Sequence, residues 1–408
     1  MFSINPAFYN QDKIASKYYD DSYKILNYNK AFICDNDTKL GAYRSVVLDS
    51  VDNSVVCVAP PKSVTFEHFK DIFTNVSVTE IIEGTMINLF YDKRRASWEI
   101  ASKGAVGGNY WYFRTEYDGG KQPTFRDMFI DALGAEPGSQ LNDIVILNEL
   151  SKSQIYSFVL QHPNNHIVLN IIHPQLYLVA VYEQLPIDAE GDIKIRIVPM
   201  SEVRNYDINK CAKNIILLPK EIDFNECVNS AIQFPGENHK ANYNVSFDRR
   251  MFDVGYMFTD LDSGLRSAVL NPRYAEIKGI RGNHPNLQYQ YFELFQAGKL
   301  NEFLWYFPNY NNLFYKFHIQ SMDFIKTVHD AYVSYHIQKR GKQVRIEKAI
   351  FHHIYKLHHE KYLPSIENGG EPTIVTCRVV ADYFNAMEPK EKLYHVNYKL
   401  RQEPENNQ

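Results

Sequence analysis

The first two hundred residues alternate between short apolar runs and clusters of turn-forming residues. From about Leu40 to about Met200, β-branched and aromatic residues occur in runs of six or seven, separated by Gly, Pro, Asn and Asp. Such runs predict β-strands, and Asp52-Asn53 between the first two predicts a hairpin turn. The predicted strands are 43–48, 54–59, 85–91, 155–160, 167–172 and 176–182.

Two stretches in the same part of the chain have helical spacing instead. Residues 66–73 place Phe66, Phe69 and Phe73 at intervals of three and four, and residues 124–133 repeat this pattern behind Thr124, a candidate N-cap. The mixture predicts an α+β fold with mainly antiparallel strands.

The pattern changes after about Gln288. Aromatic and aliphatic residues recur at helical intervals in 289–307, 322–338, 348–362 and 375–387, with Thr373 as the expected cap of the last helix. We therefore predict an antiparallel-sheet domain at 1–285 and an α-helical C-terminal domain at 286–400. The polar residues 401–408 are expected to form a disordered tail.

Composition narrows the class of protein. A net charge of −4 gives no overall attraction to nucleic acid, so a polyanion site would need a local basic surface. The 29 Tyr and 25 Phe could stack on bases, although most aromatic residues fill cores. The five cysteines lack metal-site spacing, and the first residues lack a signal-peptide pattern. We expect a cytoplasmic or intracellular protein, or a virion component, that is neither secreted nor inserted in a membrane.

The most informative motif joins two predicted strands. Glu83-Gly84-Thr85 opens the strand at 85–91, and a second strand ends in Ser102-Lys103-Gly104. A glycine lets a backbone approach a ligand, and a neighbouring carboxylate can orient it. The alternative for the second segment is an ordinary glycine-rich turn.

These segments occur in order with three further pairs. The chain resembles the phage-type RNA ligases of the covalent nucleotidyltransferase superfamily in these five places, which span about residues 40 to 280. The other segments are 43–49 with 59–63, 157–168 with 176–182, and 254–258 with 268–274. The resemblance implies an antiparallel-sheet, ATP-grasp-like ligase domain that uses ATP and Mg²⁺. It also implies that Arg44, Lys62, Glu83, Gly84 and Lys103 contact the nucleotide.

The reactive groups of that family are replaced in this chain. A family lysine three residues before the glycine attacks the α-phosphate of ATP, and Ile81 stands there. Val159 and Val254 stand at the two carboxylate positions. Ala268 and Leu270 stand at the two lysines that hold the triphosphate. Because adenylyl transfer needs the amine, the metal and the positive charge together, these replacements favour a degenerate site.

Three functions remain open from the sequence. The first is a pseudoenzyme that binds nucleic acid (RNA or single-stranded DNA), or a protein partner through its C-terminal helices. The second is a divergent but active ATP-dependent RNA ligase, with Lys103 as substitute nucleophile and Glu83 orienting it. The third is a structural protein of a large DNA virus, because this Asn- and Tyr-rich chain resembles proteins of such viruses.

A further segment mixes basic and aromatic residues. Lys278, Arg281 and Tyr289 lie within 274–291, where they predict a single-stranded nucleic-acid surface or, alternatively, only a domain junction. His352 and His359 share a predicted helix face, but histidine pairs without Cys or acidic partners are usually not ligands. We predict no metal site.

Overall fold

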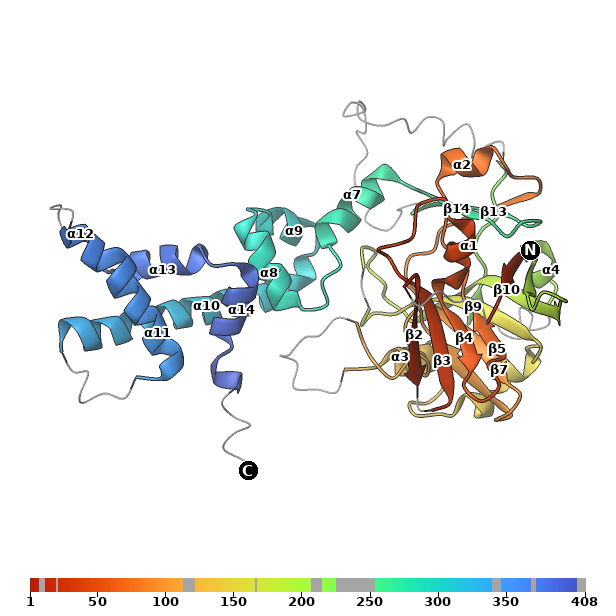
Figure 1. The fold of residues 1–408 in the computed structure, drawn as a ribbon, viewed down its shortest axis with the longest axis horizontal. Coiled ribbons are helices and arrows are strands. Elements are labelled where there is room, and N and C mark those ends of the chain that lie inside the picture. Colours follow the sequence, from red (N-terminus) through yellow and green to blue (C-terminus); the bar gives the residue numbers. More distant parts are fainter. Residues whose placement is uncertain are drawn as a thin grey trace. The chain divides into compact units, whose positions relative to one another are not determined.

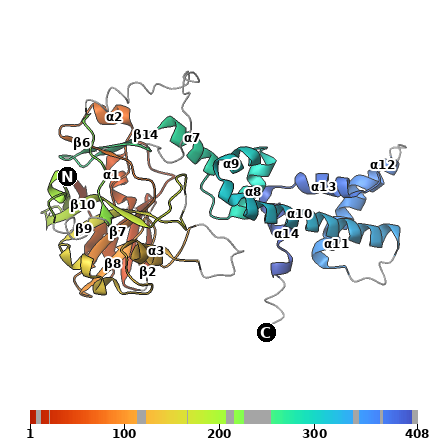
Figure 2. The ribbon, with the colours of Figure 1, turned by 180° about the vertical axis from the view of Figure 1, so that it is seen from behind.

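The computed structural model describes residues 1–6, 12–19, 21–112, 122–165, 167–206, 215–224, 254–339, 346–367 and 372–401. The described residues form two compact units, one extending to Gly279 and the other beginning at Ile280. Figures 1 and 2 show that the strands belong to the first unit, whereas the second consists of helices. The mixed α/β class with antiparallel sheets and C-terminal helices is therefore confirmed. The change of unit falls inside helix α7 (Pro272–Arg281), slightly before the predicted boundary at 285.

Three sheets make up the described part of the first unit. The largest has seven strands, all paired antiparallel except β12 with β10. In hydrogen-bonded order they are β1 (Phe2–Ile4), β11 (Ile193–Val198), β10 (Gln175–Ile187), β9 (Gln154–Gln161), β7 (Thr85–Asp92) and β8 (Ser97–Ala101), with β12 (Ile216–Leu217) beside β10.

The other two sheets are smaller and antiparallel. The four-stranded sheet contains β2 (Ile14–Tyr19), β3 (Tyr23–Tyr28), β4 (Val46–Asp49) and β5 (Val55–Val58). The three-stranded sheet contains β14 (Arg266–Leu270), β13 (Gly255–Asp260) and β6 (Val76–Glu80).

The large sheet is covered on both faces because its side chains alternate between two cores. Leu89 packs with Phe129 of α3 (Phe125–Ala132), whereas the next residue, Phe90, packs against the four-stranded sheet. Thr124 caps α3 by accepting from the Asp127 backbone, as the sequence predicted. The remaining helices of this unit are α1 (Thr38–Gly41), η1 (Ala42–Arg44), α2 (Phe66–Lys70), η2 (Leu141–Asp143), η3 (Val145–Glu149) and α4 (Met200–Val203).

Several predicted elements differ from the structure. Residues 167–172 do not form a strand, because their backbone bonds to a side chain instead of to a neighbouring strand. Thr376, not Thr373, caps α13 by accepting from Val379. The strands β2, β3 and β11 were not predicted, since Lys in each strand, with Asn in β3 and Arg in β11, interrupts their apolar runs. The predicted tail beyond Arg401 lies outside the described residues.

The helical unit is built around aromatic residues. The rings of Phe303 and Phe314 stack with centroids 5.1 Å apart, and Phe324 packs against Phe384. Its elements are α8 (Leu287–Gln296), α9 (Leu300–Tyr306), η4 (Pro308–Tyr310), α10 (Asn311–Tyr332), α11 (Lys348–Leu357), α12 (Leu363–Glu367), α13 (Cys377–Asn385), α14 (Pro389–Val396) and η7 (Lys399–Arg401). Two π-helical turns, η5 (Val333–Ile337) and η6 (His358–Tyr362), extend α10 and α11.

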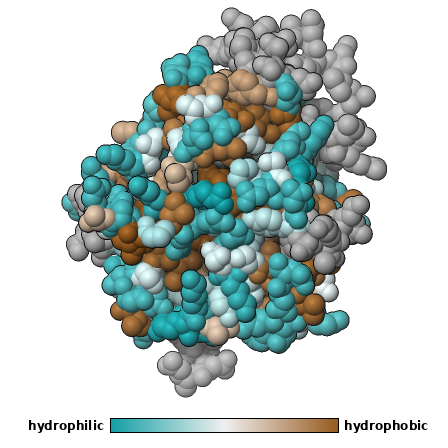
Figure 3. Space-filling view, turned by 90° about the vertical axis from the view of Figure 1, so that its right-hand side faces the viewer, coloured by the Kyte–Doolittle hydropathy of each residue, from teal (hydrophilic) through white to brown (hydrophobic). Residues whose placement is uncertain are grey.

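The outer surface mixes residue types. Figure 3 shows one face of the molecule, on which hydrophilic groups surround smaller apolar patches. In the part of the chain that the structure describes, no helix is both long and apolar enough to span a membrane.

Candidate functional site

Glu83 and Gly84 lie where the chain enters β7. Gly84 has a φ of +152°, and a Cβ atom there would lie 2.4 Å from the Leu160 carbonyl oxygen. Only glycine therefore fits against β9 at this point. The motif glycine has a packing role that does not require a ligand.

The Glu83 side chain is buried and holds three donors. Its carboxylate accepts from the backbone N–H groups of Val168 (3.0 Å) and Leu169 (2.8 Å) and from the Tyr274 hydroxyl (2.6 Å). Burial and the negative charge of Glu83 raise the pKa of Tyr274. The segment that was expected to be a strand at 167–172 thus serves as a loop that surrounds Glu83.

Apolar residues occupy the positions that the resemblance assigns to the nucleophile and to one carboxylate. Ile81 is half-buried, and its N–H donates to the Gly255 carbonyl oxygen at 2.8 Å. Val254, which precedes Gly255, is buried. Ala268 and Leu270 lie on β14. These side chains offer no amine and no oxygen ligand, so they do not fit the Mg²⁺-dependent transfer that the resemblance implies.

One lysine that the sequence did not single out lies beside this position. The Glu80 N–H donates to the Lys220 carbonyl at 3.0 Å, and the Lys220 N–H donates to the Glu80 carboxylate at 2.8 Å. Lys220 is exposed and 140 positions from Glu80 in the sequence, so spacing could not have revealed it.

The backbones of Arg44 and Lys103 both lie beside Asn27. With the Asn27 amide oriented so that its nitrogen faces acceptors, this nitrogen donates to the backbone carbonyl oxygens of both residues. Arg44 is half-buried at the end of η1, and Lys103 is exposed. Lys62 instead forms an ion pair with Asp35 at 3.2 Å. Two of the three residues predicted to contact the nucleotide therefore lie on neighbouring backbone segments.

Basic and aromatic groups continue from Lys103. Its Nζ lies 4.9 Å from the ring centre of Tyr28, and Lys17 Nζ lies 4.7 Å from that of Tyr19. The Tyr19 hydroxyl donates to the Gly104 carbonyl, which joins the two pairs. We call Lys17, Tyr19, Tyr28 and Lys103 the Lys–Tyr surface. Within the described ranges, neither lysine forms an ion pair with a carboxylate.

A buried arginine lies on the strand that carries Ala268. Arg266 is 8% exposed; its Nη2 lies 3.5 Å from the Met257 sulfur, and its Nη1 has no hydrogen-bond partner. Burial, reinforced by the positive charge of Arg44, lowers the pKa of Arg266, while Tyr182 opposes this shift. Arg266 is the first residue of β14, and nothing in the sequence indicated that an arginine at this position would be buried.

A second buried side-chain donor without a partner belongs to Asn88 on β7. Asn88 Oδ1 accepts from Ser157 at 2.7 Å, while its Nδ2 has no partner. Asn88 and Phe90 are two positions apart on β7, so their side chains lie on the same face of the strand, the face toward the four-stranded sheet. Arg266 Nη1 and Asn88 Nδ2 are thus two buried nitrogen donors without a hydrogen-bond partner among the described residues of this unit.

The three predicted nucleic-acid residues have different environments. Lys278 is exposed in the first unit, whereas Arg281 and Tyr289 belong to the second. Arg281 is fully buried and donates to Gln290 at 2.9 Å and to Tyr310 at 3.1 Å. Tyr289 stacks on His284 with ring centres 4.1 Å apart. The burial of Arg281 does not fit an exposed contact, because its donors serve the packing of the helical unit.

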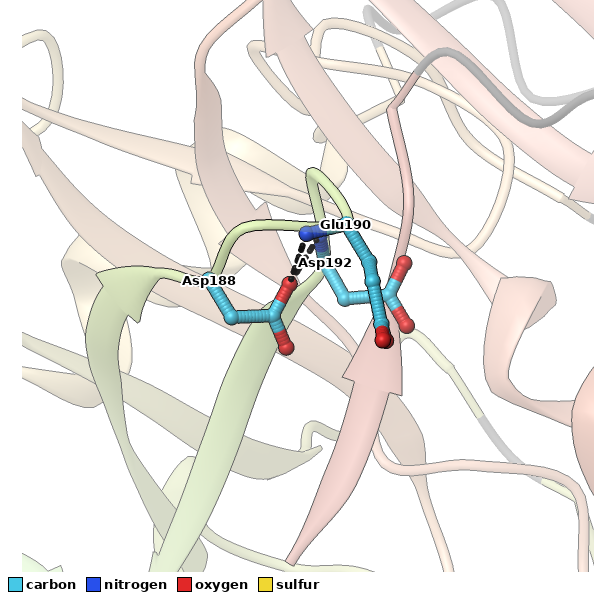
Figure 4. A group of neighbouring side chains, drawn as sticks. All are labelled: Asp188, Glu190 and Asp192. Carbon is cyan, nitrogen blue, oxygen red and sulfur yellow. Dashed lines mark hydrogen bonds between the residues drawn. The ribbon is translucent and has the colours of Figure 1, made fainter.

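An acidic group lies in the turn between β10 and β11. Asp188, Glu190 and Asp192 have carboxylate oxygens within 4.8 Å of one another (Figure 4). Asp188 accepts the N–H groups of the other two, and Asp192 accepts from the Asn5 amide at 2.7 Å. These hydrogen bonds explain why the three acidic residues lie close together, because they stabilise a tight turn.

Some histidines of the helical unit are buried or half-buried, whereas His352 and His359, which share the predicted helix face, are exposed. His353 is 1% exposed; its Nδ1 lies 2.9 Å from the Tyr383 hydroxyl and its Nε2 lies 3.1 Å from His395 Nδ1. The two π-helical turns bring His336 and His358 into parallel stacking, with ring centres 3.9 Å apart. These contacts give the histidines a packing role that helical spacing alone did not predict.

Comparison with known proteins gives distant likenesses. No protein-family model and no curated protein matches the chain. A putative ATP-dependent DNA ligase from Aquifex aeolicus shares 10% identity at a TM-score of 0.38, over 86% of each chain. A point mutant of an RNA ligase from Naegleria gruberi with ATP and Mn shares 11% identity at a TM-score of 0.31. A second mutant of that ligase, without ligand, gives 10% and 0.30. The match spans about half of the Naegleria chains (53%) and 52% of this chain.

Proposed function

We propose that the first unit is a ligase-like nucleotidyltransferase domain that binds nucleic acid but does not transfer adenylate. The observation that carries the proposal is the state of the Glu83 motif. Its carboxylate is saturated by three structural donors, and Ile81 occupies the position where the family has its amine. The hydrogen bonds of Glu83 support folding, and Ile81 provides no nucleophile.

The Lys–Tyr surface supports nucleic acid as the partner. Lys17 and Lys103 can neutralise phosphates, and Tyr19 and Tyr28 present rings for base stacking. The whole chain has a net charge of −4, so such a local basic surface is what a polyanion would require. Single-stranded RNA or DNA exposes the unstacked bases that this arrangement suits.

Intact-protein mass spectrometry after incubation with ATP and Mg²⁺ tests the absence of transfer. We expect no mass gain of one AMP. A gain that is acid-labile but stable to neutral hydroxylamine would mean a phosphoramidate and would overturn the proposal. The variants Lys103→Ala and Lys220→Ala would then show which amine carries the adduct.

Fluorescence anisotropy with single-stranded oligonucleotides tests the binding. The double variant Lys17→Ala/Lys103→Ala should weaken binding of every sequence and reduce its dependence on salt. Lys70→Ala is the control, because Lys70 is an exposed lysine paired with Glu67 on α2. Equal affinity of the double variant and the wild type would exclude the Lys–Tyr surface.

A further inference from the structure

Helix α10 carries apolar residues on both of its faces. Phe317 and Phe324 are buried on the inner face, in the core of the helical unit. On the outer face, Tyr315, Ile319 and Met322 are 64%, 40% and 48% exposed. A helix that packs on one side normally carries polar residues on the other, so the outer apolar residues require a separate explanation.

The three outer residues form one continuous stripe along the helix. Tyr315, Ile319 and Met322 are spaced by four and three positions, which places them on the same face of an α-helix. We call these three residues the α10 stripe. Single exposed apolar side chains are ordinary, whereas a stripe of large ones at this spacing is typical of the seam between two paired helices.

Two residues of opposite charge flank the α10 stripe on one side. Lys316 and Asp323 are exposed, and each follows a residue of the stripe by one position, so both lie on the same flank. In the part of the chain that the structure describes, neither of them forms an ion pair. The two charges lie at equal distances from the midpoint between Ile319 and Gln320.

We propose that the α10 stripe is the contact between two copies of this chain, with their α10 helices antiparallel about a two-fold axis beside Ile319. In this arrangement Ile319 meets Ile319 of the second copy. Tyr315 packs against Met322 of the second copy, because the axis exchanges the two ends of the stripe. An interface about a two-fold axis uses the same surface on both copies, so it must be complementary to itself.

The charges favour a second copy as the occupant of this face. The two-fold axis reverses the direction of the helix but keeps each flank on the same side. Lys316 of either copy therefore lies opposite Asp323 of the other, which gives two attractive pairs and no like charges opposite each other. A partner of unrelated sequence would not require Lys316 and Asp323 to be placed symmetrically about Ile319.

The size of the α10 stripe sets the expected strength of the dimer. Three partly exposed side chains on each copy cover less than the about 800 Å² per partner of a standard stable interface. We therefore expect a dimer that dissociates in the micromolar range. This inference concerns the helical unit and is independent of the function proposed for the first unit.

Sedimentation velocity of the full chain, from about 1 to about 300 µM, provides the first test. The wild type should change from monomer to dimer as its concentration rises. Ile319→Glu should weaken dimerisation about a hundredfold or more, because it places two carboxylates at the axis. Ile366→Glu is the matched control: Ile366 lies on α12 of the same unit and is 44% exposed, and its replacement should leave dimerisation unchanged.

Charge exchange tests the antiparallel arrangement. Lys316→Glu and Asp323→Lys should each weaken dimerisation about tenfold, because each places like charges opposite each other twice. The double variant Lys316→Glu/Asp323→Lys should regain the wild-type affinity. An equal mixture of the two single variants should form a mixed dimer, since one chain then carries two negative charges and the other two positive charges at these positions.

The same measurements can overturn the proposal. A wild type that stays monomeric at every concentration would assign the α10 stripe to a different partner and refute the homodimer. Equal dimerisation of Ile319→Glu and the wild type would place the contact elsewhere. Failure of the double charge exchange to recover the affinity lost in both single variants would contradict the antiparallel pairing. Because all substituted side chains are exposed, each variant should keep the melting temperature of the wild type, which confirms that it is folded.

Discussion

The Tyr274 hydroxyl donates to the Glu83 carboxylate at 2.6 Å and joins positions 191 residues apart. Glu83 lies just before β7, and Tyr274 lies in the first turn of α7. The same carboxylate also holds the loop that contains Val168 and Leu169. This one side chain therefore fixes a strand, a loop and a helix of the first unit.

Replacing Glu83 should destabilise the first unit. Glu83→Ala leaves two backbone N–H groups and a buried hydroxyl without acceptors, which should cost about 3 kcal/mol or more of unfolding free energy. Tyr274→Phe loses a single bond to the carboxylate and should cost about 1.5–3 kcal/mol. Urea denaturation measures both, and an unchanged midpoint for Glu83→Ala would contradict the structural role of this residue.

Gly84 should not tolerate a side chain. Gly84→Ala would place Cβ 2.4 Å from the Leu160 carbonyl oxygen at a φ of +152°, and it should cost about 2 kcal/mol or more. Gly104→Ala is the matched control, since no atom lies within 4 Å of its added Cβ. Its unfolding free energy should stay within about 0.5 kcal/mol of the wild type. Equal losses in the two variants would exclude the steric argument.

The helical unit should lose stability in acid. Burial, with the positive charges of His395, His352 and Lys356, lowers the pKa of His353 to about 3, against an ordinary value of about 6.5. The unfolded chain therefore binds the proton more readily. The stability is complete above about pH 6.5 and falls by about 1.4 kcal/mol per pH unit as pH decreases toward 3.

Hydrogen exchange of α11 peptides between pH 7 and 4.5 measures this loss, after correction for the intrinsic pH dependence of exchange. His353→Gln removes the titrating group, so its α11 peptides should show a smaller change in protection over the same range. His329→Gln is the control, because His329 is a partly exposed histidine of the same unit, beside Asp330. Identical pH profiles for His353→Gln and the wild type would show that another group is responsible.

Restoring the lysine alone should not restore chemistry. Ile81→Lys supplies an amine at the position that the resemblance assigns to the nucleophile, but Val254 gives no metal ligand and Ala268 and Leu270 give no positive charge. We expect no AMP adduct by intact-protein mass spectrometry with ATP and Mg²⁺. An adduct in Ile81→Lys that is absent from the wild type would show that the remaining residues still support transfer.

Local patterns predicted much of the fold. The strands at 85–91 and 155–160 are mainly apolar, with Asn88 and Ser157 as their mid-strand polar residues, and the helix after Thr124 has both a cap and an apolar face, so each was correctly predicted. The run at 167–172 has the same composition as a strand but bonds to Glu83 instead. No local pattern distinguishes these two outcomes, because the deciding partner lies more than 80 residues away.

The candidate site was less accessible to sequence reasoning. Arg44 and Lys103 were predicted from the resemblance, and their backbone carbonyl oxygens lie beside the Asn27 amide. Arg266, Tyr274 and Lys220 were not predicted, because their importance comes from burial or from contacts between distant segments. Arg281 was predicted as a nucleic-acid contact because it lies among aromatic residues, but such a basic residue can also belong to the core.

The contacts of Glu83 and Gly84 bear on how motifs persist in a lineage. Selection for folding alone would retain both residues. The Glu83 carboxylate accepts three hydrogen bonds, and Gly84 has no side chain that would clash with β9. Their presence in a sequence then reflects a requirement of the fold and gives no information about catalytic activity. A search that scores Glu-Gly-Thr as a mark of catalysis would therefore also select chains in which these residues serve the fold.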